Sequence, residues 1–183
     1  MAVRSTMSYL ISKVRSNIGD TAGAMQVFSD QEIQDTLDSR RKDVYDYPLS
    51  ESPNELDYFA EHGWWEASPT ITLSDDSVLT SVSTPVFIAS ENLVAGQWTL
   101  NTTPNSTVRL SGKRYDVNGA SADLLDAWMG KVKLEFDFLE LGSTFKASQQ
   151  IVMLEVAAKR FRARQWISSS PTRRSDEYAG WYS

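Results

Sequence analysis

The stretch Phe28-Ser29-Asp30-Gln31-Glu32-Ile33 decides the fold, because it carries the signals of a helix start next to a region of quite different character. Ser29 at the N-cap and Glu32 three residues later match a capping box, and the apolar residues on either side form a hydrophobic staple. A start of this kind contributes about 1 kcal/mol to helix stability. The spacing predicts a helix that continues through Val44 and is bounded by Pro48.

A second helix is predicted on the N-terminal side of this segment. Its apolar residues follow the spacing i, i+3, i+4 and i+7, which places them on one helix face. Ser5 or Thr6 is expected to cap it, and Gly19 is expected to end it in the left-handed conformation. The apolar residues are Met7, Leu10, Ile11 and Val14.

Helical periodicity returns near Asn118 and continues toward the C-terminus. Gly142 interrupts it, and Ser143 or Thr144 is expected to cap a last long helix. Each of these two helices is expected to carry a stripe of apolar residues along one face. The stripe of the first helix is Leu124, Leu125, Trp128 and Val132, and the stripe of the second is Ile151, Leu154, Ala158 and Phe161.

Residues 57–114 consist of short β-branched or aromatic runs separated by Gly, Pro, Asn and Asp, which predicts a small antiparallel sheet of roughly four to six strands. The fold class is therefore α+β. We expect a discontinuous core of about four helices (1–56 and 115–167), an inserted β subdomain (57–114) and an extended C-terminal tail (168–183).

The charge is distributed unevenly along the chain. Residues 1–145 hold 11 basic and 21 acidic side chains, a net charge of −10, whereas residues 146–174 carry +6 and residues 175–183 carry −2. A basic segment on an acidic body indicates docking onto an acidic partner or onto an acidic face of a neighbouring copy. A solvated helix face with a charged tail is the alternative.

The residues that usually carry out catalysis are scarce in this chain. It has no cysteine and one histidine, His62, for which no partner residues occur at a useful spacing. Asp75-Asp76 lacks the spacing of a calcium loop and is expected to form a turn. Phosphate-binding and hydrolase motifs are absent from the sequence. We therefore expect a protein that is not an enzyme and uses no metal or cofactor.

No stretch of about 18 apolar residues occurs, and the first residues lack the apolar core of a signal peptide. The sequence therefore predicts no association with a membrane. The absence of cysteine fits assembly in a reducing cytoplasm.

The helical segments resemble the head–tail adaptor (connector) proteins of tailed bacteriophages. The resemblance covers roughly residues 5–45 and 115–165. The order and spacing of the matching segments are more specific than any one segment alone. The residues that carry it are 10–15, 18–20, 28–34, 37–38, 115–117, 119–128 and 142–149.

This resemblance implies a structural subunit of the phage neck, located in the virion at the head–tail junction. Twelve copies usually form a ring that joins the portal protein to tail-proximal proteins and lets DNA pass without specific recognition. A C-terminal extension commonly anchors the ring in the portal. The candidate anchor residues here are Arg173, Arg174, Tyr178, Trp181 and Tyr182. The long β insert departs from a minimal adaptor.

Two other functions remain open from the sequence. The first is another neck component, a stopper or tail-completion protein, although such proteins are mostly β. The second is a DNA-binding accessory protein that uses the basic end of the last helix, where cations and aromatic residues alternate. The residues of that basic last-helix interface are Arg160, Arg162, Arg164 and Trp166.

Overall fold

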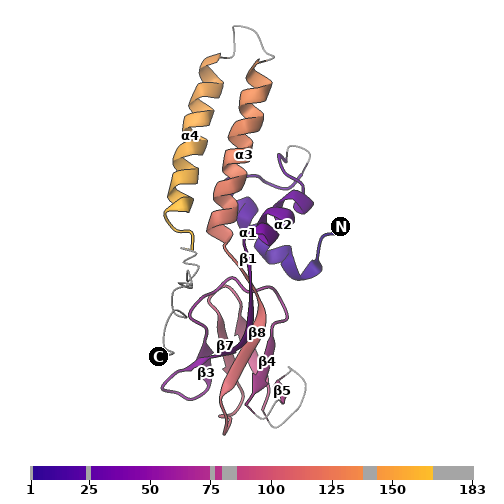
Figure 1. Ribbon diagram of the computed structural model, residues 1–183, viewed down its shortest axis with the longest axis vertical. Coiled ribbons are helices and arrows are strands. Elements are labelled where there is room, and N and C mark those ends of the chain that lie inside the picture. Colours follow the sequence, from indigo (N-terminus) through magenta and orange to yellow (C-terminus); the bar gives the residue numbers. More distant parts are fainter. Residues whose placement is uncertain (1, 24–25, 75–76, 80–85, 138–143, 167–183) are drawn as a thin grey trace, which may run out of the picture.

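The computed structural model describes residues 2–23, 26–74, 77–79, 86–137 and 144–166, which form the predicted α+β fold. Helices α3 and α4 lie side by side as a long hairpin that extends away from the strands, and α1 and α2 lie beside the strand-proximal half of α3 (Figure 1). A short 3-10 turn, η1, precedes α1. The bounds are η1 Ser5–Met7, α1 Ser8–Ile18, α2 Asp30–Ser39, α3 Val117–Asp137 and α4 Thr144–Arg162.

The strands form two antiparallel four-stranded sheets, where the sequence predicted one. Sheet A has the order β1-β8-β4-β5, and sheet B has the order β2-β3-β7-β6. The bounds in sheet A are β1 Arg41–Pro48, β4 Thr70–Leu73, β5 Val78–Leu79 and β8 Val108–Tyr115. The bounds in sheet B are β2 Ser50–Glu51, β3 Asp57–Phe59, β6 Ile88–Asn92 and β7 Gln97–Leu100.

The predicted helix signals are confirmed at two of three positions. The Ser29 hydroxyl accepts a hydrogen bond from the Glu32 N–H (3.2 Å), and the Glu32 carboxylate accepts one from the Ser29 N–H (2.7 Å), which completes the capping box. Gly19 ends α1 with φ 73°. The predicted cap by Ser5 or Thr6 is wrong, because both residues lie within η1 and the N-cap residue of α1 is Met7.

The prediction that the second helix continues through Val44 is also wrong. Helix α2 ends at Ser39, and β1 begins at Arg41 and pairs with β8 from Arg41↔Tyr115 onward. Residues 43–47 contain a β-branched and two aromatic side chains, which suit a pleated strand, and the ladder to β8 supplies the partner. The sheet residues therefore begin at Arg41, within the range 1–56 that was predicted to be helical.

The helices share one hydrophobic core. Leu10, Ile33 and Leu125 are fully buried in it, and the ring of Phe28 meets that of Trp128 edge-on with centroids 6.3 Å apart. The predicted stripe of α3 is confirmed by the burial of Leu124, Leu125 and Val132. On α4, Ala158 is fully buried, whereas the other stripe residues are partly buried at the edge of this core.

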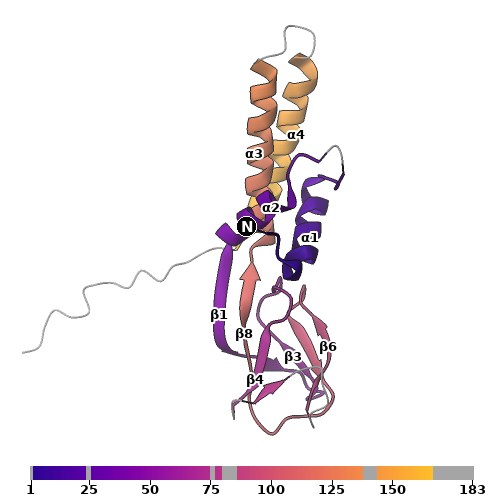
Figure 2. The ribbon, with the colours of Figure 1, turned by 90° about the vertical axis from the view of Figure 1, so that its right-hand side faces the viewer.

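The two sheets pack on each other around a second core. Trp65 and Trp98 lie at its centre with an edge-on contact (centroids 6.1 Å apart), and residues of both sheets surround them. Figure 2 shows β1 and β8 running together toward the helices. Because β1 follows α2 and β8 precedes α3, the chain leaves and rejoins the helices through adjacent strands.

A buried polar network joins the helices to sheet A. The Glu66 carboxylate accepts hydrogen bonds from the hydroxyls of Thr6 and Tyr115 (both 2.6 Å) and from Arg4 (3.1 Å), and Arg4 also pairs with Asp38. Burial would raise the pKa of Glu66, but the hydrogen bonds and the Arg4 charge outweigh it, so the pKa lies below its ordinary value. This network holds the two cores together.

Candidate functional site

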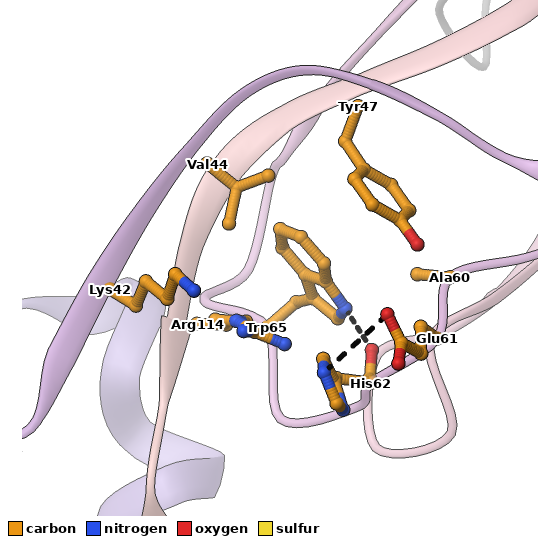
Figure 3. A pocket seen from close by; sticks show the side chains of 8 residues that line it. All are labelled: Lys42, Val44, Tyr47, Ala60, Glu61, His62, Trp65 and Arg114. Carbon is orange, nitrogen blue, oxygen red and sulfur yellow. Dashed lines mark hydrogen bonds and ion pairs between the residues drawn. The ribbon is translucent and has the colours of Figure 1, made fainter. Parts of the chain in front are cut away.

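A pocket of about 200 Å³ opens where β1, the end of β8 and the segment after β3 meet (Figure 3). The cationic side chains of Lys42 and Arg114 reach it from one side, and Glu61 faces them from the other. Apart from His62, the other lining residues are apolar or aromatic. The lining residues are Lys42, Val44, Tyr47, Ala60, Glu61, His62, Trp65 and Arg114.

Arg114 is the unusual residue of this pocket. It is 9% exposed, and its buried Nε has no hydrogen-bond partner among the residues that the structure describes. No carboxylate of the described chain forms an ion pair with it. Burial accordingly lowers the pKa of Arg114, with Glu61 and Tyr47 acting weakly in the opposite direction. A buried guanidinium without an anion is costly to a fold.

The ladder of sheet A explains why this charge is buried. Arg114 on β8 pairs with Lys42 on β1, and an isolated bridge joins it to Trp65 on its other side. Its neighbour Tyr115 is buried as well, and the Tyr115 hydroxyl binds Glu66 in the polar network. The alternation of exposed and buried residues is lost at the end of β8, because both faces of the strand are covered there.

Trp166, after the end of α4, covers Arg114. The guanidinium carbon lies 4.5 Å from the centre of the indole, a cation–π contact, and the His62 ring lies 5.8 Å from it. The backbone N–H of Trp166 donates a hydrogen bond to the Asp116 carboxylate (3.2 Å), which also accepts one from the backbone N–H of Gly119 near the start of α3. The C-terminal end of the described chain is thereby fixed over the pocket.

In the predicted basic last-helix interface, Arg160, Arg162 and Arg164 are all exposed. Arg162 also forms an ion pair with Asp126 of α3. Trp166 faces the sheets, where it stacks on Arg114. The residues predicted to anchor the protein in the portal, Arg173, Arg174, Tyr178, Trp181 and Tyr182, lie outside the described residues.

Sequence reasoning missed Arg114. A single arginine in a strand is normally a solvent-facing residue, and its burial follows from long-range pairing with Lys42 and Trp65. His62, for which the sequence showed no partner residues at a useful spacing, is partly exposed at the pocket rim. Its backbone oxygen accepts a hydrogen bond from the Trp65 indole N–H (2.7 Å). Asp75 and Asp76 lie outside the described residues.

Helix α4 carries a second notable surface. Val152, Met153 and Val156 are all exposed on it, with Met153 at 75%. Beside them lies a hollow of about 410 Å³ between α1, α3 and α4, lined by Ile18, Leu125 and Leu154 among others. Exposed apolar residues this close together are typical of a surface that contacts another molecule.

Among the residues that the structure describes, no three His, Asp or Glu side chains are grouped so that they could hold a metal ion. Within the same part of the chain, no helix has the length and apolar character needed to cross a membrane. Comparison with known proteins adds no assignment, because no family model and no curated protein matches this sequence.

Proposed function

We propose that this protein is a structural ring subunit of a bacteriophage neck, which joins the portal vertex to the tail and lets DNA pass. Its partners are then the portal protein, tail-proximal proteins and further copies of itself, usually twelve in a ring. The observation that carries the proposal is that the residues resembling the adaptor family pack together in one core. Leu10 and Val14 of α1, Phe28 and Ile33 at α2, and Leu124 and Leu125 of α3 all belong to one helical core.

The surface chemistry supports an assembly role. Val152, Met153 and Val156 give α4 an exposed apolar face, and ring formation would cover such a face. The acidic body suits a passage for DNA, because it would repel phosphates and prevent tight binding. The residues described at the pocket contain no assembled nucleophile and base.

Electron microscopy of virions, or of purified portal mixed with this protein, tests the proposal. We expect a ring directly below the portal whose subunits accommodate the long α3–α4 hairpin. Density for this protein at the tail tip, or an absence of binding to the portal, would contradict it.

A C-terminal truncation tests the predicted portal anchor. We expect that deleting residues 171–183 leaves the fold intact, because both cores lie before residue 167, but prevents stable portal attachment. Co-purification with portal and circular dichroism measure the two effects. Replacing Thr172 and Ser175 by Ala in the full chain is the matched control and should retain attachment. Normal recovery of the truncated protein with portal would exclude the anchor.

A stopper or tail-completion protein is the second candidate, and the two four-stranded sheets favour it more than the sequence did. Position in the particle separates the two, because the proposed adaptor ring contacts the portal directly. A DNA-binding accessory protein is less well supported, because Trp166 packs inward and Arg162 is paired. Retention on DNA at about 0.2 M salt would favour that function.

A further inference from the structure

We propose that the Arg114 pocket receives a glutamate from a second copy of this chain, namely Glu55 in the turn between β2 and β3. This inference rests on the proposed ring and assigns one of its subunit contacts to sheets A and B. The pocket supplies a buried guanidinium that lacks an anion, and the turn supplies a carboxylate that lacks a cation.

The pocket suits a single acidic side chain. Small-molecule sites commonly enclose about 300–1,000 Å³, whereas this one encloses about 200 Å³. Lys42 and Arg114 would face the carboxylate on the side of the pocket opposite Glu61, and the aromatic walls of Trp65 and Tyr47 would contact its aliphatic stem. A phosphodiester would place its solvated backbone against those apolar walls, so the pocket favours a protein side chain over DNA.

The two sheets carry complementary charge. The strands of sheet A hold five basic residues against two acidic ones, whereas those of sheet B hold three acidic residues and neither Lys nor Arg. The basic residues of sheet A are Arg41, Lys42, Arg109, Lys113 and Arg114, and the acidic ones are Asp43 and Asp46. The acidic residues of sheet B are Glu51, Asp57 and Glu91. Complementary potentials of this kind select a partner and set its orientation.

The β2–β3 turn is held in one conformation and presents Glu55 to solvent. Backbone hydrogen bonds from Glu55 to Ser52 (2.9 Å) and from Ser52 to Asp57 (2.8 Å) close it, and the Asn54 side chain accepts from two N–H groups. Glu55 has φ 60°, a conformation that glycine or asparagine adopts more easily. Its exposed carboxylate has no ion pair or hydrogen bond to any residue that the structure describes.

The β2–β3 turn and the pocket lie at opposite ends of β3. The turn precedes β3, whereas the pocket residues Ala60, Glu61 and His62 follow it, so β3 separates the two sites by about 10 Å or more. The contact is therefore between different patches of two copies, a head-to-tail arrangement. Such an interface generates a ring when its rotation closes.

Site-specific cross-linking tests this contact, because the chain has no cysteine of its own. Pro53→Cys places a thiol in the turn, and His62→Cys places one at the pocket rim. Mixing the two single-cysteine proteins with a short bis-maleimide should give a covalent heterodimer, and the chain carrying both should give a ladder of oligomers. Val78→Cys on exposed β5 replaces Pro53→Cys in the matched control and should give at least tenfold less heterodimer.

Two charge variants make the test specific. Arg114→Met in the His62→Cys protein and Glu55→Gln in the Pro53→Cys protein should each reduce the heterodimer to the Val78→Cys level. Circular dichroism establishes that both remain folded. An unchanged yield in either variant overturns the inference. So does an intramolecular cross-link between His62→Cys and Asp176→Cys, since the chain's own C-terminal carboxylates would then fill the pocket.

The proposed function and this contact can fail independently. If a ring is found below the portal but the heterodimer yield is the same with and without Arg114→Met, only the proposed contact is overturned. Specific cross-linking without a ring in virions would overturn the neck assignment and leave head-to-tail association in place.

Discussion

The helical region and the sheet region each bury one arginine, and the two side chains differ in whether they have ion-pair partners. Arg15 of α1 pairs with Asp20 (2.8 Å) and Asp30 (2.7 Å) and donates to the Phe28 carbonyl (2.8 Å). Arg114 of β8 is covered to a similar degree and lies against the face of Trp166, but it forms no ion pair with any residue that the structure describes. Arg15 is therefore part of the fold, whereas Arg114 is open to an anion from another molecule.

The contrast shows how to separate structural from functional charges in this protein. A buried ion pair that is satisfied within the chain fixes a loop, as the Arg15–Asp20 pair fixes the segment before α2. A buried charge left unsatisfied costs stability, and such costs are concentrated at sites that bind something. Three substitutions, from the largest expected effect on stability to the smallest, test this comparison.

Arg15→Met should have the largest effect. It leaves the buried Asp20 without its cation and should lower the free energy of unfolding by about 3 kcal/mol. Urea denaturation followed by circular dichroism measures the change. Lys13→Met removes an exposed charge from the same helix and should change stability by no more than about 0.5 kcal/mol. Equal effects of the two variants would contradict the structural role of Arg15.

Glu66→Gln should have an intermediate, pH-dependent effect. Its pKa is lowered in the folded protein, so its stabilising contribution is full above the unfolded-state value near 4.5 and is lost as the pH falls through the folded-state pKa. We expect a loss of about 2 kcal/mol at pH 7, because charged hydrogen bonds to Arg4, Thr6 and Tyr115 are weakened. The difference from the original protein should shrink below pH 4.5 in urea titrations at several pH values. A constant difference would exclude the ionised network.

Arg114→Met should have the smallest effect, with the opposite sign to Arg15→Met. Removing an unpaired buried charge should leave stability unchanged or raise it by up to about 1 kcal/mol. The methionine side chain can keep a contact with the Trp166 ring. Urea denaturation of the isolated protein, followed by circular dichroism, measures this change in the free energy of unfolding. A loss of 2 kcal/mol or more would show that Arg114 is satisfied within the chain.

Much of the helical region could be predicted because its signals are local. The capping box at Ser29, the end of α1 at Gly19 and the stripe of α3 each depend on residues within a few positions of one another. The end of α2 could not be predicted in this way. Residues 41–48 become a strand because β8, distant in sequence, lies beside them. The division of the strands into two sheets depends on the same kind of long-range pairing.

The candidate site could not be predicted from any motif. Lys42, His62, Arg114 and Trp166 are far apart in the chain, and only the pairing of β1 with β8 and the end of α4 brings them together. The sequence did predict an uneven charge distribution and an interface at the end of the last helix. It located that interface on Arg160, Arg162, Arg164 and Trp166, and this stays a prediction. The sequence could not show that Arg162 pairs with Asp126 or that Trp166 contacts Arg114.

The sequence by itself determined the α+β class, most of the helix boundaries and the acidic body with its basic C-terminal segment, since composition, periodicity and caps act over short distances. Tertiary structure alone decided which strands pair, where the two cores lie and which charge is left without a partner. The physical reason is that burial and ion pairing depend on neighbours that are brought together only by folding. Arg15 and Arg114 look alike in the sequence, and the fold alone distinguishes them.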